Sequence, residues 1–554
     1  MANYYDDNKD IEFYLNNYDL SELVSLYENN YEEVKKYDFA PENYNDAMEN
    51  YKLSLNILGK IAGDIIAENA DSVDEEGAKF ENGEVTYAKG TRINLDMLKK
   101  AGLNGVTLPR EYFGLNFPTL IYVMMIEIVS RADGSLMNLF GLQDIGETIN
   151  DFGSEEQKKK YCSAFAKGEA TGAMILTEPD AGSDLQSVRT KAVWDEKESC
   201  FRLYGVKRFI TNGNADISLV LARSEEGTTD ARGLSMFVIE RDETVQIRRI
   251  EDKLGIHGSP TCEIEFHGTK AELVGKRGYG LIKYVMTLMN GARIGVSAQA
   301  LGIAEEAYRE AYAYAEEREQ FGKSIINFPM VRRMLDDMKM ELDAMRALLY
   351  NTTIAVDYKK IYEKKYEATG DKSIRKLYQY YNKLAGFLTP LSKFYLTEVG
   401  NKICYDALQI HGGTGYMRDF KIQRLYRDIR ITNIYEGTTQ LQVVAAIGFI
   451  TSGLYFKFME EAIEKTELGL VEHINKTKDL LNELKALVEL LKKEENHTKK
   501  EYYESDLVEI AAIITIAIFM LQNAKYSEEK VQIAERYIHE RFPKAKYLID
   551  RIKS

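Results

Sequence analysis

One carboxylate in this sequence has surroundings that suit proton transfer. Glu436 lies between Tyr435 and Gly437, where a run of Arg and Asp residues gives way to apolar and small polar ones. A carboxylate in partly dry surroundings tends to have a raised pKa, which suits a general base. Gly437 has no Cβ, so backbone or ligand can approach closely. The alternative is an ordinary surface Glu at a helix start, where the helix dipole favours an acid. The local sequence leaves both interpretations open.

Two further segments carry groups that could hold a polar, flat ligand. In Leu176–Asp184 (LTEPDAGSD), proline and glycine impose turns, and Thr177 and Ser183 supply hydroxyls. In the segment FITNG, Phe209 stands two residues before Thr211 and is followed by a turn. An aromatic ring beside a hydrogen-bonding hydroxyl is what a flat heteroaromatic cofactor requires.

A glycine-rich segment offers exposed backbone amides. Gln409–Gly415 (QIHGGTG) could contact a pyrophosphate through these N–H groups. It is not a GxGxxG motif and follows no predicted strand, so a Rossmann nucleotide site is not expected. Taken alone, each of these segments could also be a turn followed by a helix cap.

The composition is that of a large globular protein. The chain has 554 residues, too many for one core, so three or four domains are expected. The net charge of −15 argues against a nucleic-acid surface. The four cysteines lie far apart without metal-ligand spacing, so neither a metal site nor a disulfide framework is expected and a cytoplasmic location fits. No targeting signal is visible at the acidic N-terminus, and the apolar run Ile510–Leu521 predicts a buried helix rather than membrane insertion.

The periodicity of apolar residues changes twice along the chain. Residues 1 to about 170 read as helical, residues 171 to about 270 as short strands, and the remainder as helices at roughly 281–318, 328–357, 373–402 and 404–412. The highly charged segment Asp357–Asp371 predicts a loop or a solvated extension. Residues 451–554 are again helical. Alternating βαβ units are absent from this pattern, so a parallel-sheet fold is not expected.

Five segments together resemble the acyl-CoA dehydrogenase family. They are LTEPDAGSD, FITNG, EEREQFG (Glu316–Gly322), QIHGGTGY and RDIRITNIYEGTTQLQ, in the family's order and spacing. The resemblance implies a mostly α fold with a central β domain: a helical N-terminal domain, a middle β-barrel and a C-terminal four-helix bundle, with FAD bound between them. An extra C-terminal helical domain is added here. The predicted parts are an N-terminal extension (1–44), an N-terminal α-helical domain (45–170), a middle β domain (171–278), a C-terminal four-helix domain (279–450) and an additional helical domain (451–554).

The resemblance also implies an activity. These enzymes remove the α-proton of an acyl-CoA while hydride passes from Cβ to flavin N5, giving a trans-2-enoyl-CoA. Glu436 matches the base. Some relatives place that base on an earlier helix, but the matching residue here is Ala292, which cannot accept a proton.

The remaining matches assign cofactor and substrate contacts. Phe209 takes a position usually held by Trp, Asn290 one where Asp is common, and a His-Gln pair of the family is Phe328-Pro329 here. The implied FAD contacts are Thr177, Ser183, Phe209, Thr211, Arg318, Gln320, Phe321, Gln409, Gly412, Gly413, Thr438 and Gln440, and the implied substrate contacts are Ser183, Asn290, Arg293 and Gly437.

The N-terminal lead and the C-terminal tail are similar to the larger bacterial subgroup that includes the methylmercaptopropionyl-CoA dehydrogenases. That likeness implies a homodimer, and the family resemblance as a whole implies electron-transferring flavoprotein as electron acceptor. Three other functions stay open. They are an acyl-CoA oxidase that uses oxygen, a flavoprotein with a DNA-associated protective role, and a purely structural protein without flavin.

Overall fold

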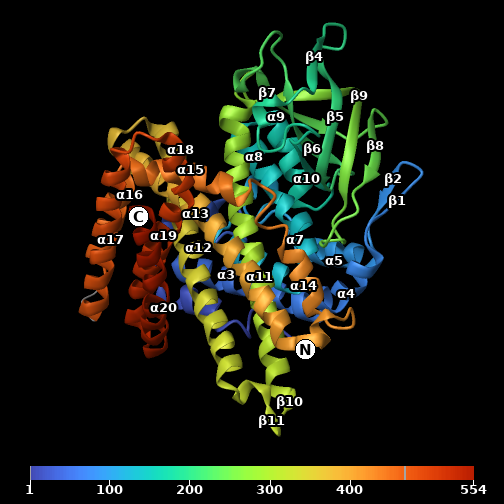
Figure 1. Ribbon diagram of the computed structural model, residues 1–554. Coiled ribbons are helices and arrows are strands. Elements are labelled where there is room, and N and C mark those ends of the chain that lie inside the picture. Colours follow the sequence, from blue (N-terminus) through green and yellow to red (C-terminus); the bar gives the residue numbers. More distant parts are fainter. Residues whose placement is uncertain (1, 467–469) are drawn as a thin grey trace. The chain divides into compact units, whose positions relative to one another are not determined.

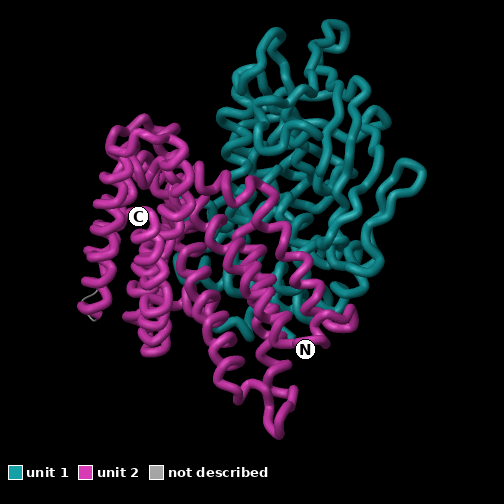
Figure 2. Tube along the Cα trace, in the orientation of Figure 1, with its two compact units in different colours: residues 1–9, 27–295 teal, residues 10–26, 296–554 magenta. Residues whose placement is uncertain are grey.

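The computed structural model describes residues 2–466 and 470–554. The chain divides into two compact units, which Figure 2 shows in different colours. Unit 1 consists of residues 1–9 and 27–295, and unit 2 of residues 10–26 and 296–554. Helix α11 (Met286–Glu317) runs from one unit into the other.

The helical part of unit 1 is built around α6 (Thr119–Ala132). All of its 14 residues are buried, since its sequence is mostly apolar. Its buried polar groups have partners: Glu127 accepts a hydrogen bond from Asn8 Nδ2 at 3.1 Å, and Arg131 Nη2 donates to Asp7 at 2.9 Å. The other elements here are η1 (Asn29–Lys35), α3 (Tyr44–Ile61), η2 (Ala62–Ile66), α4 (Ala67–Glu76), β1 (Lys79–Glu81), β2 (Glu84–Thr86), α5 (Lys89–Lys100), η3 (Arg110–Tyr112), α7 (Gly134–Phe140), η4 (Gly141–Gln143), α8 (Asp144–Phe152), α9 (Glu155–Gln157), η5 (Lys158–Cys162) and α10 (Ser163–Ala166).

The strands of unit 1 close into a barrel. β6 pairs with β4 and with β7, and the ring continues from β4 through β5 and β9 back to β7, while β3 and β8 pair at β6 and β9. Alternate residues of β6 face opposite sides: Leu219 and Leu221 join a cluster with the helices, and Val220 joins the barrel core. The predicted middle barrel is therefore confirmed. The strands are β3 (Gly172–Ile175), β4 (Lys191–Asp195), β5 (Cys200–Thr211), β6 (Ile217–Arg223), β7 (Leu234–Glu240), β8 (Val245–Ile250) and β9 (Thr261–Val274), and short helices η6 (Leu185–Ser187), η7 (Ala231–Gly233) and η8 (Gly280–Val285) connect or follow them.

Unit 2 contains the long helices of the predicted bundle. After α11, α12 (Pro329–Thr369) and α13 (Lys372–His411) run antiparallel and pack along each other, and α15 (Thr439–Thr451) packs on α13 (Figure 1). Shorter elements lie between them: β10 (Glu319–Gln320), β11 (Lys323–Ser324), η9 (Ile325–Asn327), η10 (Gly412–Tyr416) and α14 (Ile422–Ile429).

The predicted break in α12 is wrong. The helix does not end at residue 357 but continues to Thr369, and α13 continues without a break to His411. The reason is tertiary: Tyr358 of α12 stacks on Tyr381 of α13 with ring centroids 4.7 Å apart, so the charged segment has a packed face. The turn itself is a left-handed Gly370 (φ +66°) followed by Asp371. Residues 367–373 are exposed, as a solvated extension would be.

The C-terminal extension of unit 2 is built around α19 (Glu504–Asn523). It packs against α12, α15, α17 (Val471–Lys492) and α20 (Glu528–Lys553). By length and composition, Glu504–Tyr526 could cross a membrane, as could a bent pair of α15 and α16 (Leu454–Glu464); 89% of the most apolar window of the former is buried within the protein. The remaining elements are α18 (His497–Tyr502) and η12 (Ala524–Tyr526).

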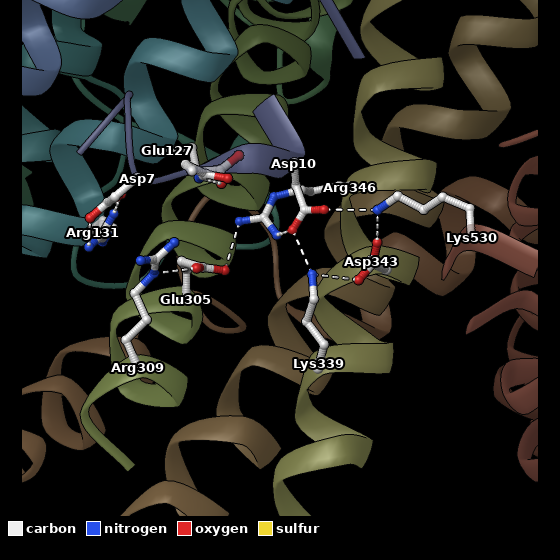
Figure 3. A network of polar contacts seen from close by, with 11 residues as sticks. Asp7, Asp10, Glu127, Arg131, Glu305, Arg309, Lys339, Asp343, Arg346 and Lys530 are labelled. Atoms are coloured by element: carbon white, nitrogen blue, oxygen red, sulfur yellow. Dashed lines mark hydrogen bonds and ion pairs between the residues drawn. The ribbon is translucent and has the colours of Figure 1, made fainter. Parts of the chain in front are cut away.

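A charged network joins the two ends of the chain within unit 2. Asp10 of α1 (Lys9–Asn17) accepts hydrogen bonds from Lys339 Nζ at 2.7 Å, Arg346 Nη1 at 2.9 Å and Lys530 Nζ at 2.8 Å, as Figure 3 shows. Lys530 also donates to Asp343. Burial alone would raise the pKa of Asp10, but the three cations outweigh it and hold that pKa well below its ordinary value. The segment that carries α1 and α2 (Ser21–Tyr27) is thereby fixed to α12 and α20.

Candidate active site

The loop after β3 positions the first pair of predicted residues in unit 1. Thr177 is half-buried and Ser183 is exposed. Between them the buried carboxylate of Glu178 accepts hydrogen bonds from the N–H and hydroxyl of Thr190, at 2.8 and 2.6 Å. Lys207 Nζ lies 3.0 Å from the same carboxylate and donates to the carbonyl of Leu176 at 2.7 Å.

The buried ion pair between Glu178 and Lys207 holds the loop after β3 in place. Burial lowers the pKa of Lys207 to about 8, which leaves it mostly protonated at neutral pH. Burial opposes ionisation of Glu178, but Lys207 and Thr190 outweigh it and lower its pKa. The sequence analysis missed both residues, although Glu178 stands inside the quoted motif. Lys207 stands beside Arg208 in β5, so residue type alone did not mark it as a buried charge.

Phe209 has a backbone conformation that is rare for an aromatic residue. Its φ is +62°, at an irregularity of β5 between Lys207 and Ile210, and 53% of the side chain is exposed. The guanidinium of Arg208 lies 4.7 Å from the ring centroid. The Arg208 N–H donates to the carbonyl of Thr177 at 3.0 Å, so the structure brings the loop and the predicted aromatic segment together. Thr211, at the end of β5, is half-buried.

The predicted CoA-binding pair lies at the start of α11, in the part that belongs to unit 1. Arg293 is buried and its Nη1 donates to Asn290 Oδ1 at 3.0 Å. Asn290 is exposed. The two residues are therefore coupled, as i and i+3 positions on one helical face allow.

In unit 2, Arg318, Gln320 and Phe321 lie on a short hairpin after α11. Phe321 (φ +50°) and Gly322 (φ +81°) form its turn, since two left-handed residues match the twist of a two-residue hairpin. All three predicted residues are exposed, and 94% of the Phe321 side chain is open to solvent.

The glycine segment follows the end of α13. Gln409, Gly412 and Gly413 are exposed, and Gly412 has φ +61°. His411 points the other way: its ring is buried, stacks on Tyr314 at 4.4 Å, and places Nδ1 2.8 Å from the carbonyl of Ala407. Burial lowers the pKa of His411. This residue holds the loop against α11.

Glu436 occupies a strained turn before α15. Its φ is +55° and that of Gly437 is +90°, so two consecutive residues are left-handed. This conformation costs a non-glycine residue about 1 kcal/mol or more. Thr438 is the N-cap of α15, and Gln440 is exposed on its first turn. The strain requires support from neighbouring groups.

That support comes from side chains behind the turn. Lys393 of α13, fully buried, donates from Nζ to the carbonyl of Tyr435 at 2.7 Å and also to the carbonyl of Gly437. Gln442 Nε2 donates to the Gly437 carbonyl at 2.8 Å. The Tyr435 hydroxyl donates to Gln299, and burial, aided by the charge of Glu436, raises the pKa of this tyrosine. Sequence reasoning missed Lys393, whose signal is a single charge within the apolar stretch 385–396.

Comparison with known proteins identifies the class of enzyme to which this fold belongs. The chain matches the N-terminal (residues 59–169), middle (173–269) and C-terminal (280–446) domains of acyl-CoA dehydrogenases. It belongs to the acyl-CoA dehydrogenase family, whose members are oxidoreductases.

Individual relatives agree with this assignment. The chain is 34% identical over 437 residues to 3-methylmercaptopropionyl-CoA dehydrogenase of Ruegeria pomeroyi, covering 74% of this chain and 72% of that protein. The structure of butyryl-CoA dehydrogenase from Megasphaera elsdenii is 30% identical, with a TM-score of 0.61 over 73% of this chain and 98% of that one. An acyl-CoA dehydrogenase from Bacillus anthracis complexed with FAD shares the fold at a TM-score of 0.77 and 22% identity, over 91% and 88% of the two chains.

The residues present fit FAD, the cofactor of this family. Phe209 has a strained backbone, and its side chain is exposed. An exposed aromatic ring can stack on the flat ring system of a flavin. A Cβ built on Gly412 or Gly413 would meet no atom within 4 Å, so their backbone is open to a bulky phosphate group.

Proposed function

We propose that this protein catalyses FAD-dependent α,β-dehydrogenation of an acyl-CoA thioester to a trans-2-enoyl-CoA, with Glu436 as the base. The observation that supports this most strongly is the Glu436 turn. A carboxylate stands there on a strained backbone that buried side chains hold in place, in a chain of the acyl-CoA dehydrogenase family.

A carboxylate such as Glu436 cannot readily remove the α-proton of a thioester without help, because that proton is only weakly acidic. The negative charge that develops on the thioester oxygen has to be stabilised as the proton leaves. In our proposal the N–H of Glu436 donates to that oxygen. One such donor contributes about 3–4 kcal/mol, and a positioned general base adds about 10²–10⁴-fold.

The other predicted residues bind and orient the reactants. Asn290, Arg293, Ser183 and Gly437 are proposed to contact the CoA thioester, and position it for proton transfer. When bound, FAD supplies the acceptor for the hydride that leaves Cβ, at flavin N5. We assign its binding to Thr177, Ser183, Phe209, Thr211, Arg318, Gln320, Phe321, Gln409, Gly412, Gly413, Thr438 and Gln440.

The proposal extends to partners. Electron-transferring flavoprotein is the proposed electron acceptor, the exposed Arg318–Gly322 hairpin supports a homodimer in which a second copy covers it, and the proposed location is the cytoplasm.

The test is anaerobic mixing of the purified flavoprotein with acyl-CoA thioesters of graded length and branching. The panel includes butyryl-CoA and 3-methylmercaptopropionyl-CoA, which the names of two relatives indicate. We expect at least one thioester to bleach the flavin and to yield a trans-2-enoyl-CoA. A flavin that no member bleaches would contradict the proposal.

The same preparation separates the alternatives. Peroxide release without an added acceptor indicates an oxidase. Retention on DNA that falls with salt indicates the DNA-associated role. A colourless purified protein indicates a structural one.

A further inference from the structure

We propose that Lys393 is a positioning residue for proton transfer: it holds the peptide group that precedes Glu436 and the carbonyl of Gly437, and so orients the Glu436 N–H. This inference rests on the proposed role of Glu436. It adds a residue, 43 positions earlier in the chain, that acts through the backbone beside Glu436.

The geometry begins with the burial of Lys393. None of its surface is exposed, although lysine is among the residues least often buried. Its Nζ donates to the carbonyl of Tyr435 at 2.7 Å and to that of Gly437. The two acceptors are the carbonyl oxygens of the residues immediately before and after Glu436.

These two hydrogen bonds stabilise the strained backbone of the turn. Glu436 (φ +55°) and Gly437 (φ +90°) are both left-handed, a conformation that a short turn keeps only when its surroundings fix it. Gln442 adds one donor at the Gly437 carbonyl, at 2.8 Å. Among these side chains, Lys393 is the one that bonds both flanking carbonyls.

Peptide planarity carries the effect to the reacting side. The carbonyl of Tyr435 and the N–H of Glu436 belong to one peptide group, and every peptide bond of the described residues is trans. In a trans peptide the two groups point in opposite directions. Because the carbonyl points at Lys393, the N–H of Glu436 points away from α13.

The charge of the lysine adds to this geometry. A hydrogen bond from an ammonium is roughly twice as strong as one from a neutral donor. An ammonium at the carbonyl also polarises the peptide group, so its N–H becomes a better donor to a developing negative charge. A neutral amide at this position would support the turn without that polarisation.

The experiment separates this role from simple packing. The holoenzyme is incubated with an acyl-CoA in D2O, and NMR measures exchange of the α-hydrogen, which needs the base and the oxyanion donor but no electron transfer. Lys393→Met keeps the length of the side chain and removes its donors. We expect the exchange rate and the rate of flavin reduction to fall about 10- to 100-fold, with flavin content and acyl-CoA Kd within threefold of wild type.

The matched control is Lys402→Met on the same helix. Lys402 is 67% exposed and pairs with Asp406, so its removal leaves both rates unchanged. Lys393→Gln, which keeps a neutral donor, should give an intermediate exchange rate. The intermediate rate distinguishes loss of charge from loss of shape.

Four outcomes decide the inference. Wild-type exchange in Lys393→Met, or in Lys393→Gln if the methionine variant does not fold, overturns it. A fall in Tm without any fall in exchange shows a purely structural lysine, and also overturns it. If neither wild type nor Glu436→Gln differs from the uncatalysed exchange, the proposed function itself has failed, whereas loss of exchange in Glu436→Gln alone leaves that function intact and Lys393 refuted.

Discussion

Asp10 and Glu436 are both carboxylates of unit 2, and lysines support them in different ways. The side chains of Lys339, Arg346 and Lys530 bond the carboxylate of Asp10 itself. Lys393 bonds the backbone carbonyls beside Glu436 instead. The first arrangement holds a charge in its ionised form and ties chain segments together. The second holds the backbone carbonyls of the residues before and after a carboxylate-bearing residue. Buried cations can therefore stabilise a charge directly, as at Asp10, or hold a backbone conformation, as beside Glu436.

The largest expected effect is a loss of folding stability when the Asp10 network is broken. Asp10→Asn leaves three cations without the carboxylate they share, and breaking a buried pair of this kind costs about 3 kcal/mol or more. We expect a lower urea midpoint and a Tm lower by several degrees, with flavin reduction per bound flavin unchanged.

The control for that variant is Glu472→Gln. Glu472 is 75% exposed and pairs with Lys476 on α17, so its loss should leave the midpoint nearly unchanged. Equal midpoints for Asp10→Asn and Glu472→Gln would show that the network contributes no net stability.

Lowering the pH should reduce the difference in stability between wild type and Asp10→Asn. The folded-state pKa of Asp10 lies below its unfolded value, so its contribution is complete above about pH 4 and is lost as pH falls further. The stability gap between wild type and Asp10→Asn should therefore shrink progressively below about pH 4. A gap that widens on acidification would reverse the assigned sign.

The smallest effect on stability is expected for an exposed residue that we assign to flavin binding. Arg318 is exposed, so Arg318→Ala should change the Tm of the apoprotein very little. Flavin retained after gel filtration should nevertheless fall several-fold. Lys323→Ala, in the same hairpin, is the control and should retain flavin as wild type does. Identical flavin content in both variants would remove Arg318 from the binding surface.

Much of the architecture was predictable because its signals are local. Alternating apolar residues predicted strands at 218–223 and 234–240, where β6 and β7 lie, and helical spacing predicted α6 and α11. The length of α12 was not predictable, because the stacking of Tyr358 on Tyr381 that supports its charged end depends on α13.

The supporting residues of the site were hidden for the same reason. The motif around Glu436 was visible as a sequence, but Lys393 acts on it across 43 residues and only the packing of α13 brings them together. The left-handed backbone of Phe209 and Glu436 was equally invisible, since nothing in their residue types predicts a positive φ. The Asp10 network joins residues more than 500 positions apart.

The central claim is that one acid at position 436 removes the α-proton. Stopped-flow mixing of Glu436→Gln with an acyl-CoA that bleaches the wild-type flavin tests it most directly, since glutamine keeps the shape of the side chain and cannot accept the proton. We predict that flavin is retained, the thioester binds, and bleaching slows by about 10²–10⁴-fold. Bleaching at the wild-type rate would contradict the account.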